Sequence, residues 1–282
     1  MDEQRRFIVS ADWLEKRLGE PGLSIVDASW YLPAQNRNAE AEYDAAHIPG
    51  AVFFDHDLVV DTDSKLPHTL PDPLTFERHA SSMGITRKDT IVIYDGPGFF
   101  TAPRAWWMFR VMGASDVFVL DGGFDRWKSE GRPVTSEPTK TASAVFDPQF
   151  NKDAVVGFQE MRRIVEEGSV QVADARSKGR FDGSEPEPRE GMRSGHMPGA
   201  VSLPVMTLSD NGSLLDRQEL QRRFQEAGLD AEKPVVATCG SGITAAAIVL
   251  ALAEAGHDNA RLYDGSWSEW GGRDDTPVAT AE

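Results

Sequence analysis

Short apolar runs alternate with amphipathic segments along the 282 residues of the chain. Runs rich in valine and isoleucine predict buried strands, and apolar residues at helical spacing predict helices between them. The predicted strands are residues 23–28, 51–53, 90–94, 116–120, 169–174, 200–202, 234–238 and 260–263. The predicted helices are 10–18, 73–83, 103–112, 123–130, 157–167, 216–227, 243–255 and 266–270. This alternation predicts an α/β fold with parallel sheets covered by helices.

Four sequence blocks occur twice, in the same order. They are a strand that ends in Asp-Ala, a His-x-Pro-Gly-Ala block, an apolar strand before a turn, and an Asp-Gly block before a tryptophan. They begin at Ile25, His47, Ile91 and Leu120, and again 147, 149, 144 and 143 residues later at Val172, His196, Val235 and Tyr263. Four matches in register indicate a duplicated domain. The predicted domains are 1–136 and 153–282, joined by a polar, proline-containing linker at 137–152.

The only cysteine, Cys239, lies between an apolar strand and an alanine-rich helix, within a turn of small residues. Backbone N–H groups and the positive end of a helix at such a turn favour a thiolate, which is the nucleophilic form. The alternative is a small buried apolar residue, the commoner fate of a free cysteine. The glycine-flanked turn favours the nucleophile. Alignment of the two halves places Asp95 opposite Cys239, so we expect the first copy to lack sulfur chemistry.

Composition excludes several classes of function. The formal net charge of −16 argues against a nucleic-acid partner. One cysteine excludes an internal disulfide and a Cys-x-x-Cys metal or redox pair. No apolar run reaches the roughly 20 residues that span a membrane, and the acidic start is unlike a signal or transit peptide. We therefore expect a cytoplasmic enzyme. No metal or organic cofactor is indicated.

Two conspicuous features have structural explanations. The histidines of the repeated block, His47 and His196, could be catalytic, but one of them lies in the copy without a nucleophile. A buried histidine that bonds a backbone carbonyl before a Pro-Gly turn explains both copies better. The aromatic run at 106–109 predicts a buried helix rather than a ligand cage.

The repeated blocks resemble the rhodanese superfamily, in particular its two-domain sulfurtransferases, over essentially the whole chain. The resemblance implies tandem duplicated α/β domains, each with a parallel five-stranded sheet flanked by helices. Within the family, the loop Cys-Gly-Ser-Gly-Val-Thr is typical of the mercaptopyruvate group, and Cys-Arg-Lys-Gly-Val-Thr of thiosulfate enzymes. The chain is similar to the former, with one conservative departure at Ile243. The resemblance thus implies a substrate-binding loop made of Gly240, Gly242, Ile243 and Thr244, next to Cys239 and Ser241.

The uncharged loop suits a substrate whose carboxylate is bound elsewhere, whereas the compact thiosulfate dianion favours adjacent positive charge. The resemblance assigns the carboxylate and keto oxygen to Arg180 and Arg189, whose guanidinium groups can bind them in bidentate fashion. The alternative is that both arginines pair with Glu185, Glu187 or Glu190.

The resemblance further implies a relay from Asp57 through His68 to the hydroxyl of Ser241. Without the family, His68 is an ordinary loop histidine and Asp57 a solvated surface acid.

The expected reaction moves the sulfur of 3-mercaptopyruvate to a Cys239 persulfide and releases pyruvate. The outer sulfur then passes to cyanide or to a thiol acceptor such as thioredoxin, in ping-pong order. A thiosulfate sulfurtransferase and a sulfur-carrier or sensor module without turnover are the alternatives. A cysteine phosphatase is disfavoured, because Ala245 stands where the Cys-x5-Arg pattern needs arginine.

Overall fold

The computed structural model describes residues 5–230 and 232–281, so the ends of the predicted domains at 1–4 and 282 lie outside it. The contacts between residues divide the chain into two compact units. Unit 1 contains residues up to 62, 70–151 and 211–214, and unit 2 contains 63–69, 152–210 and 215 onwards. Each unit therefore takes in one short segment from the opposite half of the sequence.

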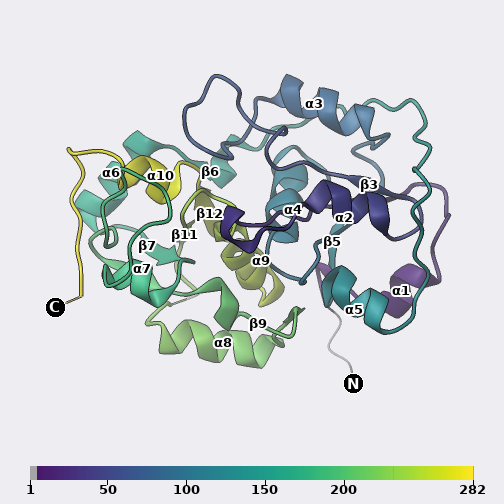
Figure 1. The fold of residues 1–282 in the computed structure, drawn as a ribbon. Helices are drawn as coiled ribbons and strands as arrows, with labels where there is room; N and C mark the ends of the chain where they lie inside the picture. Colours follow the sequence, from purple (N-terminus) through teal and green to yellow (C-terminus); the bar gives the residue numbers. More distant parts are fainter. Residues whose placement is uncertain (1–4, 231, 282) are drawn as a thin grey trace. The chain divides into compact units, whose positions relative to one another are not determined.

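Unit 1, whose helices and strands β3 and β5 are labelled in Figure 1, is built on five parallel strands in the order β1-β5-β4-β2-β3. The strands are β1 (Ile8–Val9), β2 (Leu23–Asp27), β3 (Ala51–Phe53), β4 (Thr90–Tyr94) and β5 (Val117–Leu120). The helices are α1 (Ala11–Glu15), α2 (Ala39–Ala45), α3 (Pro73–Ser82), α4 (Ala102–Val111) and α5 (Gly123–Ser129), with a 3-10 turn η1 (Pro33–Gln35). The helix α4 packs on β4 and β5.

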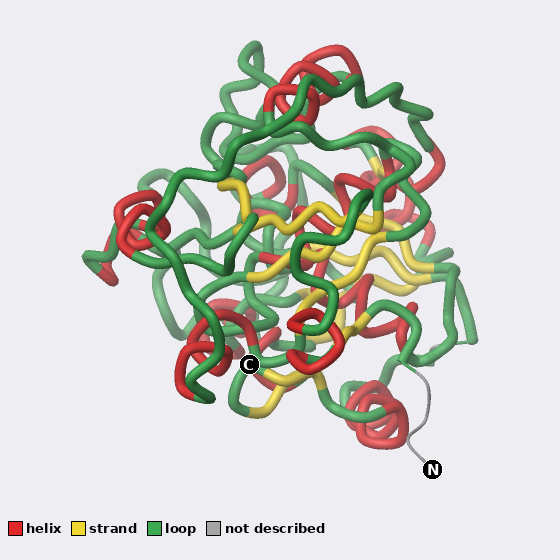
Figure 2. Tube along the Cα trace, turned by 90° about the vertical axis from the view of Figure 1, so that its right-hand side faces the viewer, coloured by secondary structure: helices red, strands yellow, loops and turns green. Residues whose placement is uncertain are grey.

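Unit 2 repeats this sheet as β6-β12-β11-β7-β8, again parallel throughout. Its strands are β6 (Val155–Val156), β7 (Gln171–Asp174), β8 (Ala200–Ser202), β11 (Val235–Thr238) and β12 (Ala260–Tyr263). Its helices are α6 (Phe158–Glu167), α7 (Lys178–Asp182), α8 (Arg217–Glu226), α9 (Ala245–Glu254) and α10 (Ser266–Trp270), with 3-10 turns η2 (Lys152–Ala154) and η3 (Val205–Thr207). Two short strands precede α8 in the sequence: β9 (Ser209–Asp210) belongs to unit 2, and β10 (Ser213–Leu214) lies in the 211–214 segment of unit 1. Figure 2 shows the strands of the chain in yellow and its helices in red.

The predicted α/β fold with two parallel five-stranded sheets is confirmed. The central strands β4 and β11 are the long apolar runs of the sequence, because a central parallel strand is buried on both faces. The sequence pattern missed β1, β6, α2 and α7. The two-residue edge strands β1 and β6 are too short to show a period. Helix α2 has no buried side chain and α7 has one, Phe181, so neither shows an apolar helical pattern.

Equivalent residues of the two copies make equivalent contacts. Trp127 and Trp270 are fully buried, and each indole N–H donates to a proline carbonyl at 2.8 Å, that of Pro133 or Pro277. His47 and His196 each place Nδ1 against a backbone carbonyl, at 2.7 and 2.8 Å, as expected; His47 is buried, whereas His196 is half-buried.

The run 106–109 is buried within α4, also as predicted. Across the described part of the chain, no helix is both long and apolar enough to cross a membrane.

Candidate active site

Cys239 is held at the carboxyl end of β11, immediately before the turn that leads into α9. Its N–H donates to Ser266 Oγ at 3.2 Å, and its carbonyl accepts the N–H of Trp267 at 2.9 Å. Its sulfur accepts the N–H of Gly242 at 3.1 Å. Gly242 has φ +85, a left-handed conformation that glycine adopts without strain and that turns this N–H toward the sulfur. The thiol is only 2 % exposed, so a reaction at Cys239 takes place in a largely desolvated environment.

Ser241 and His68 lie together in unit 2. The Nδ1 atom of His68 is 3.1 Å from the hydroxyl oxygen of Ser241, and both residues are buried. His68 comes from the 63–69 segment and has φ +57, which is unfavourable for a residue with a side chain and implies that its surroundings fix it. Asp57 belongs to unit 1, where its carboxylate accepts the indole N–H of Trp30 at 3.1 Å. The Asp57–His68 step stays a prediction.

Arg180 extends from α7 toward the residue that follows the cysteine. A Cβ atom at Gly240 would lie 3.0 Å from Nη2 of Arg180 and 3.8 Å from Nη1 of Arg189, so both guanidinium groups approach this glycine. Arg180 also gives Nε and Nη2 to Glu187, at 3.1 and 2.5 Å. The pairing and the binding roles are therefore compatible, because a guanidinium group has a second edge of N–H donors.

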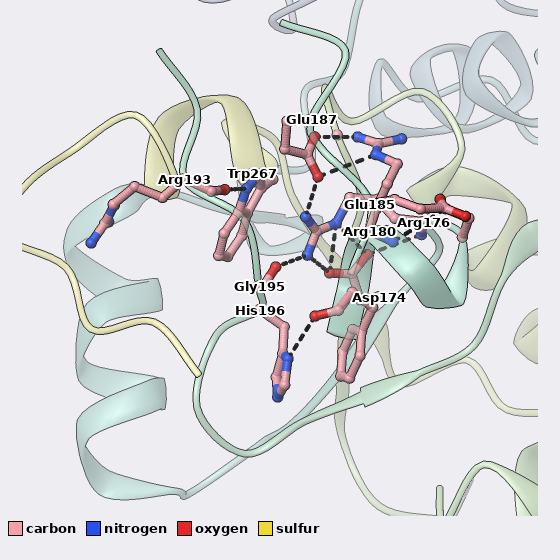
Figure 3. A network of polar contacts seen from close by, with 12 residues as sticks. Asp174, Arg176, Arg180, Glu185, Glu187, Arg193, Gly195, His196 and Trp267 are labelled. Atoms are coloured by element: carbon pink, nitrogen blue, oxygen red, sulfur yellow. Dashed lines mark hydrogen bonds and ion pairs between the residues drawn. The ribbon is translucent and has the colours of Figure 1, made fainter. Parts of the chain in front are cut away.

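Glu187, which the sequence offered only as one of three possible partners of the arginines, is a residue of the site and pairs with Arg180. Its side chain is 3 % exposed and lies between two arginines, Arg180 and Arg176, as Figure 3 shows. Arg176 donates to Glu187 at 2.7 Å and to both carboxylate oxygens of Asp174. Trp267 lies against this guanidinium group, 4.2 Å from ring centre to Cζ. The result is a buried chain of alternating charges that ends at Arg180.

In this row of four charged side chains, each carboxylate is paired with an arginine. Burial acts to lower the pKa of Arg176, but Asp174 and Glu187 outweigh it and hold the pKa above its ordinary value. The sequence carries one sign of this ion-pair network, a difference between the two copies. Asp-Ala-Arg follows the strand in the second copy, where the first copy has Asp-Ala-Ser.

The remaining loop residues precede the first residue of α9, Ala245. Ile243 is 3 % exposed, and Thr244 precedes the first helical residue without a side-chain hydrogen bond to the helix. The first N–H groups of a helix have no partner within it and point back toward the preceding residues. Contacts of Gly240, Gly242, Ile243 and Thr244 with a substrate stay predictions.

In the equivalent loop of unit 1, Asp95 stands at the position of Cys239. Asp95 is fully buried, and one oxygen of its carboxylate accepts the N–H groups of Phe100, Thr101 and Ala102 at 2.6 to 2.9 Å. Burial raises the pKa of Asp95 against the opposing effect of these donors. The side chain thus satisfies the N–H groups at the start of α4.

A family model described as the rhodanese-like domain matches residues 10–130 and 158–273. The chain belongs to the rhodanese-like family. The two matches correspond to the two copies found in the sequence, and each contains four strands of one five-stranded sheet, all but the edge strand β1 or β6.

Individual relatives cover nearly the whole chain. The 3-mercaptopyruvate sulfurtransferase of Rattus norvegicus is 42% identical, over 94% of this chain and 92% of the relative. The mitochondrial thiosulfate/3-mercaptopyruvate sulfurtransferase 1 of Arabidopsis thaliana is 41% identical, over 98% of this chain and 78% of the relative. The crystal structure of a 3-mercaptopyruvate sulfotransferase from Escherichia coli superposes with a TM-score of 0.86 at 38% identity, over 93% and 99% of the two chains.

Proposed function

We propose that Cys239 is the nucleophile of a sulfurtransferase that takes its sulfur from 3-mercaptopyruvate. The chain is a 3-mercaptopyruvate/thiosulfate sulfurtransferase, because relatives at about 40% identity over nearly its full length have this activity. The observation that supports Cys239 as the reacting atom is its place between β11 and α9, with the Gly242 N–H on its sulfur. A backbone donor at this position stabilises negative charge on the sulfur.

The first half-reaction breaks the carbon–sulfur bond of the donor. The Cys239 thiolate attacks the donor sulfur, the bond to carbon breaks, and its electron pair leaves with the pyruvate enolate. A proton then converts the enolate to pyruvate, and Cys239 keeps the sulfur as a persulfide. In the second half-reaction an acceptor thiolate or cyanide attacks the outer sulfur, and the Cys239 thiolate is regenerated.

Arg180 and Arg189 are proposed to bind the carboxylate and keto oxygen of the donor. Both approach Gly240, next to the nucleophile, and Glu187 engages only the Nε–Nη2 edge of Arg180. Glu187 is in turn held by the buried Arg176, which fixes the plane of the Arg180 guanidinium group (Figure 3). A bidentate contact depends on that plane, so Glu187 acts as a positioning residue.

Ser241 is proposed to deliver the proton to the enolate, because its hydroxyl is in hydrogen-bond reach of His68. His68 resupplies that proton, and Asp57 orients the imidazole in the proposed relay. Gly240, Gly242, Ile243 and Thr244 are proposed to surround the substrate at the start of α9.

The first domain, proposed as residues 1–136, has no sulfur chemistry because Asp95 fills the nucleophile position. The catalytic domain is proposed as 153–282, after a linker at 137–152. We further propose a thiol acceptor such as thioredoxin, in the cytoplasm, where reducing conditions suit a lone cysteine whose function needs the thiolate.

The donor assignment is tested by kcat/KM for 3-mercaptopyruvate and for thiosulfate, measured side by side with cyanide as acceptor. We expect the ratio to favour 3-mercaptopyruvate in the parent. The double variant Gly240→Arg/Ser241→Lys adds charge next to Cys239, crowds Arg180 and removes the hydroxyl, so the ratio should move toward thiosulfate. Ser241→Ala is the matched control, because it removes the hydroxyl without adding charge.

A ratio that favours thiosulfate in the parent would contradict the donor assignment. A ratio unchanged in the double variant would show that loop charge does not select the donor. Absence of pyruvate production from 3-mercaptopyruvate would instead favour a carrier or sensor module.

A further inference from the structure

Unit 1 contains a cavity of about 330 Å³ at the carboxyl end of β2. It is lined by charged side chains of both signs, including Asp27, Arg37, Glu42, Asp125 and Lys128, with aromatic walls. Its volume lies at the lower end of the range for small-molecule sites. The cavity borders Gly96, the residue after Asp95.

The cavity is the first-copy counterpart of the arginine site around Gly240. Gly96 follows Asp95 as Gly240 follows Cys239, and a Cβ atom at Gly96 would lie 3.7 Å from Nη2 of Arg37. Arg37 gives Nε and Nη2 to Glu42 at 2.9 and 2.6 Å, the same two atoms that Arg180 gives to Glu187. In both copies an arginine therefore lies near the glycine, with one edge engaged by a glutamate.

The first copy differs in the charge opposite this arginine. In unit 2 the strand-end carboxylate of Asp174 is paired with Arg176. In unit 1 the corresponding Asp27 has Ser29 in place of the arginine, and its Oδ1 accepts the Ser29 N–H at 3.0 Å; its other hydrogen-bond partner is the side chain of Tyr94, which is neutral. Asp27 is 3 % exposed, and no cation of the described residues pairs with it. A buried carboxylate that lines a cavity without a counter-cation favours a cationic ligand group.

Two further side chains distinguish this cavity from the site in unit 2. The N–H of Asp125 binds the Gly96 carbonyl as the N–H of Ser268 binds that of Gly240, so the first copy has a carboxylate where the second has a hydroxyl. Lys128, with Nζ 5.6 Å from the Phe124 ring centre, adds a cation. With Glu42 compensated by Arg37, the remaining charges are one ammonium group and two carboxylates.

We propose that this cavity binds a small α-amino acid. The ligand carboxylate contacts Lys128 and the Nη1–Nη2 edge of Arg37, and the ligand ammonium group contacts Asp27 and Asp125. Only a zwitterion satisfies both sets of charges. A ligand with only one of the two charges leaves either the buried Asp27 carboxylate or the more exposed cations Arg37 and Lys128 without a partner, so it should bind less tightly than a zwitterion.

The proposal is tested by ligand-observed NMR titration of the full chain with L-alanine, ethylamine and propionate. The last two molecules carry one charge each of the zwitterion. We expect L-alanine to bind at least tenfold more tightly than either. Asp27→Asn, Asp125→Asn and Lys128→Gln should each weaken alanine binding by about tenfold or more. Lys140→Gln, an exposed lysine outside the cavity, is the control and should leave binding unchanged.

Three results would overturn the proposal. They are the absence of alanine binding up to about 50 mM, equal binding of ethylamine or propionate, and alanine binding that none of the three cavity variants weakens. Asp125→Asn and Lys128→Gln keep the test valid if Asp27→Asn does not fold. These outcomes are independent of sulfur transfer, because every variant lies in unit 1 and the readout is binding.

Discussion

The loop after β4 and the loop after β11 occupy the same place in two sheets of equal topology, but they hold different side chains. In unit 1 the Asp95 carboxylate binds three N–H groups before and at the start of α4. In unit 2 Cys239 receives one N–H, that of Gly242. The first loop is also one residue longer before its helix begins.

The difference teaches how a duplicated fold can keep a stable site in one copy and a reactive site in the other. A carboxylate offers an internal anion that satisfies the loop, so the loop needs no ligand. The sulfur of Cys239 accepts one N–H, and in the proposed mechanism the remaining N–H groups of the helix start stabilise the outer sulfur of the persulfide. The loop backbone is common to both, and the side chain decides between structure and chemistry.

The largest difference in kcat/KM between equivalent variants of the two copies should come from the arginine next to each loop, Arg180 in unit 2 and Arg37 in unit 1. Arg180→Lys keeps the charge but loses the planar fork, so kcat/KM for 3-mercaptopyruvate should fall tenfold to a thousandfold, or about 1.4–4 kcal/mol. Arg37→Lys is the equivalent change in unit 1 and should leave kcat/KM within about threefold of the parent. Equal losses in the two variants would mean that unit 1 takes part in donor binding.

Glu187→Gln extends this comparison. It should raise KM for 3-mercaptopyruvate about tenfold with a smaller change in kcat, because Arg180 loses its orientation but remains present. Glu187→Asp should restore part of the loss. A purely structural role would instead lower the folded fraction and leave KM unchanged.

The next effect concerns stability. Asp95→Ala leaves three buried N–H groups without their acceptor and should lower the free energy of unfolding by about 3 kcal/mol. Cys239→Ala should cost about 1 kcal/mol, because it removes one weak acceptor. Calorimetry of both variants measures the difference in the free energy of unfolding.

Asp95→Asn keeps an acceptor oxygen, so the folded protein should have the same kcat as the parent. A hundredfold loss of kcat in folded Asp95→Asn would show that Asp95 is not vestigial.

The smallest effect concerns the strand-end carboxylates. Burial raises the pKa of Asp27 to about 6, whereas Ser29 and Tyr94 oppose this shift. The folded protein therefore holds this proton more tightly than the unfolded chain, and stability from Asp27 falls as pH rises from about 4 through 6 and is constant above. Relative to Asp27→Asn, the parent should lose about 2 kcal/mol between pH 4 and pH 7. A pH-independent difference between the two proteins would contradict this assignment.

The sequence alone could predict the fold because its signals are local. Buried strands such as β4 and β11 are continuous apolar runs, and the repeated blocks place them in register. It could not predict β1 and β6, whose two residues pair only because the neighbouring strand is already there. The place of the candidate nucleophile Cys239, between a central strand and a helix, was predictable from its glycine-flanked turn.

The polar network of the site was harder to predict. The role of Glu187 depends on a contact with Arg176, eleven residues away across an irregular segment, and no spacing rule indicates it. His68 is far from Ser241 in the sequence, and only the family resemblance joined them before the structure placed them 3.1 Å apart. The cavity next to Gly96 has no sequence signal, because its lining residues come from three segments that are far apart in the sequence.

The central claim is that Cys239 alone carries the transferred sulfur. The most direct test is the intact mass of the protein after incubation with 3-mercaptopyruvate in the absence of any acceptor. The parent should gain one sulfur, about 32 Da, which later addition of cyanide removes, and Cys239→Ser should gain none. A sulfur adduct that persists in Cys239→Ser, or pyruvate release by the parent with no adduct, would contradict the covalent mechanism.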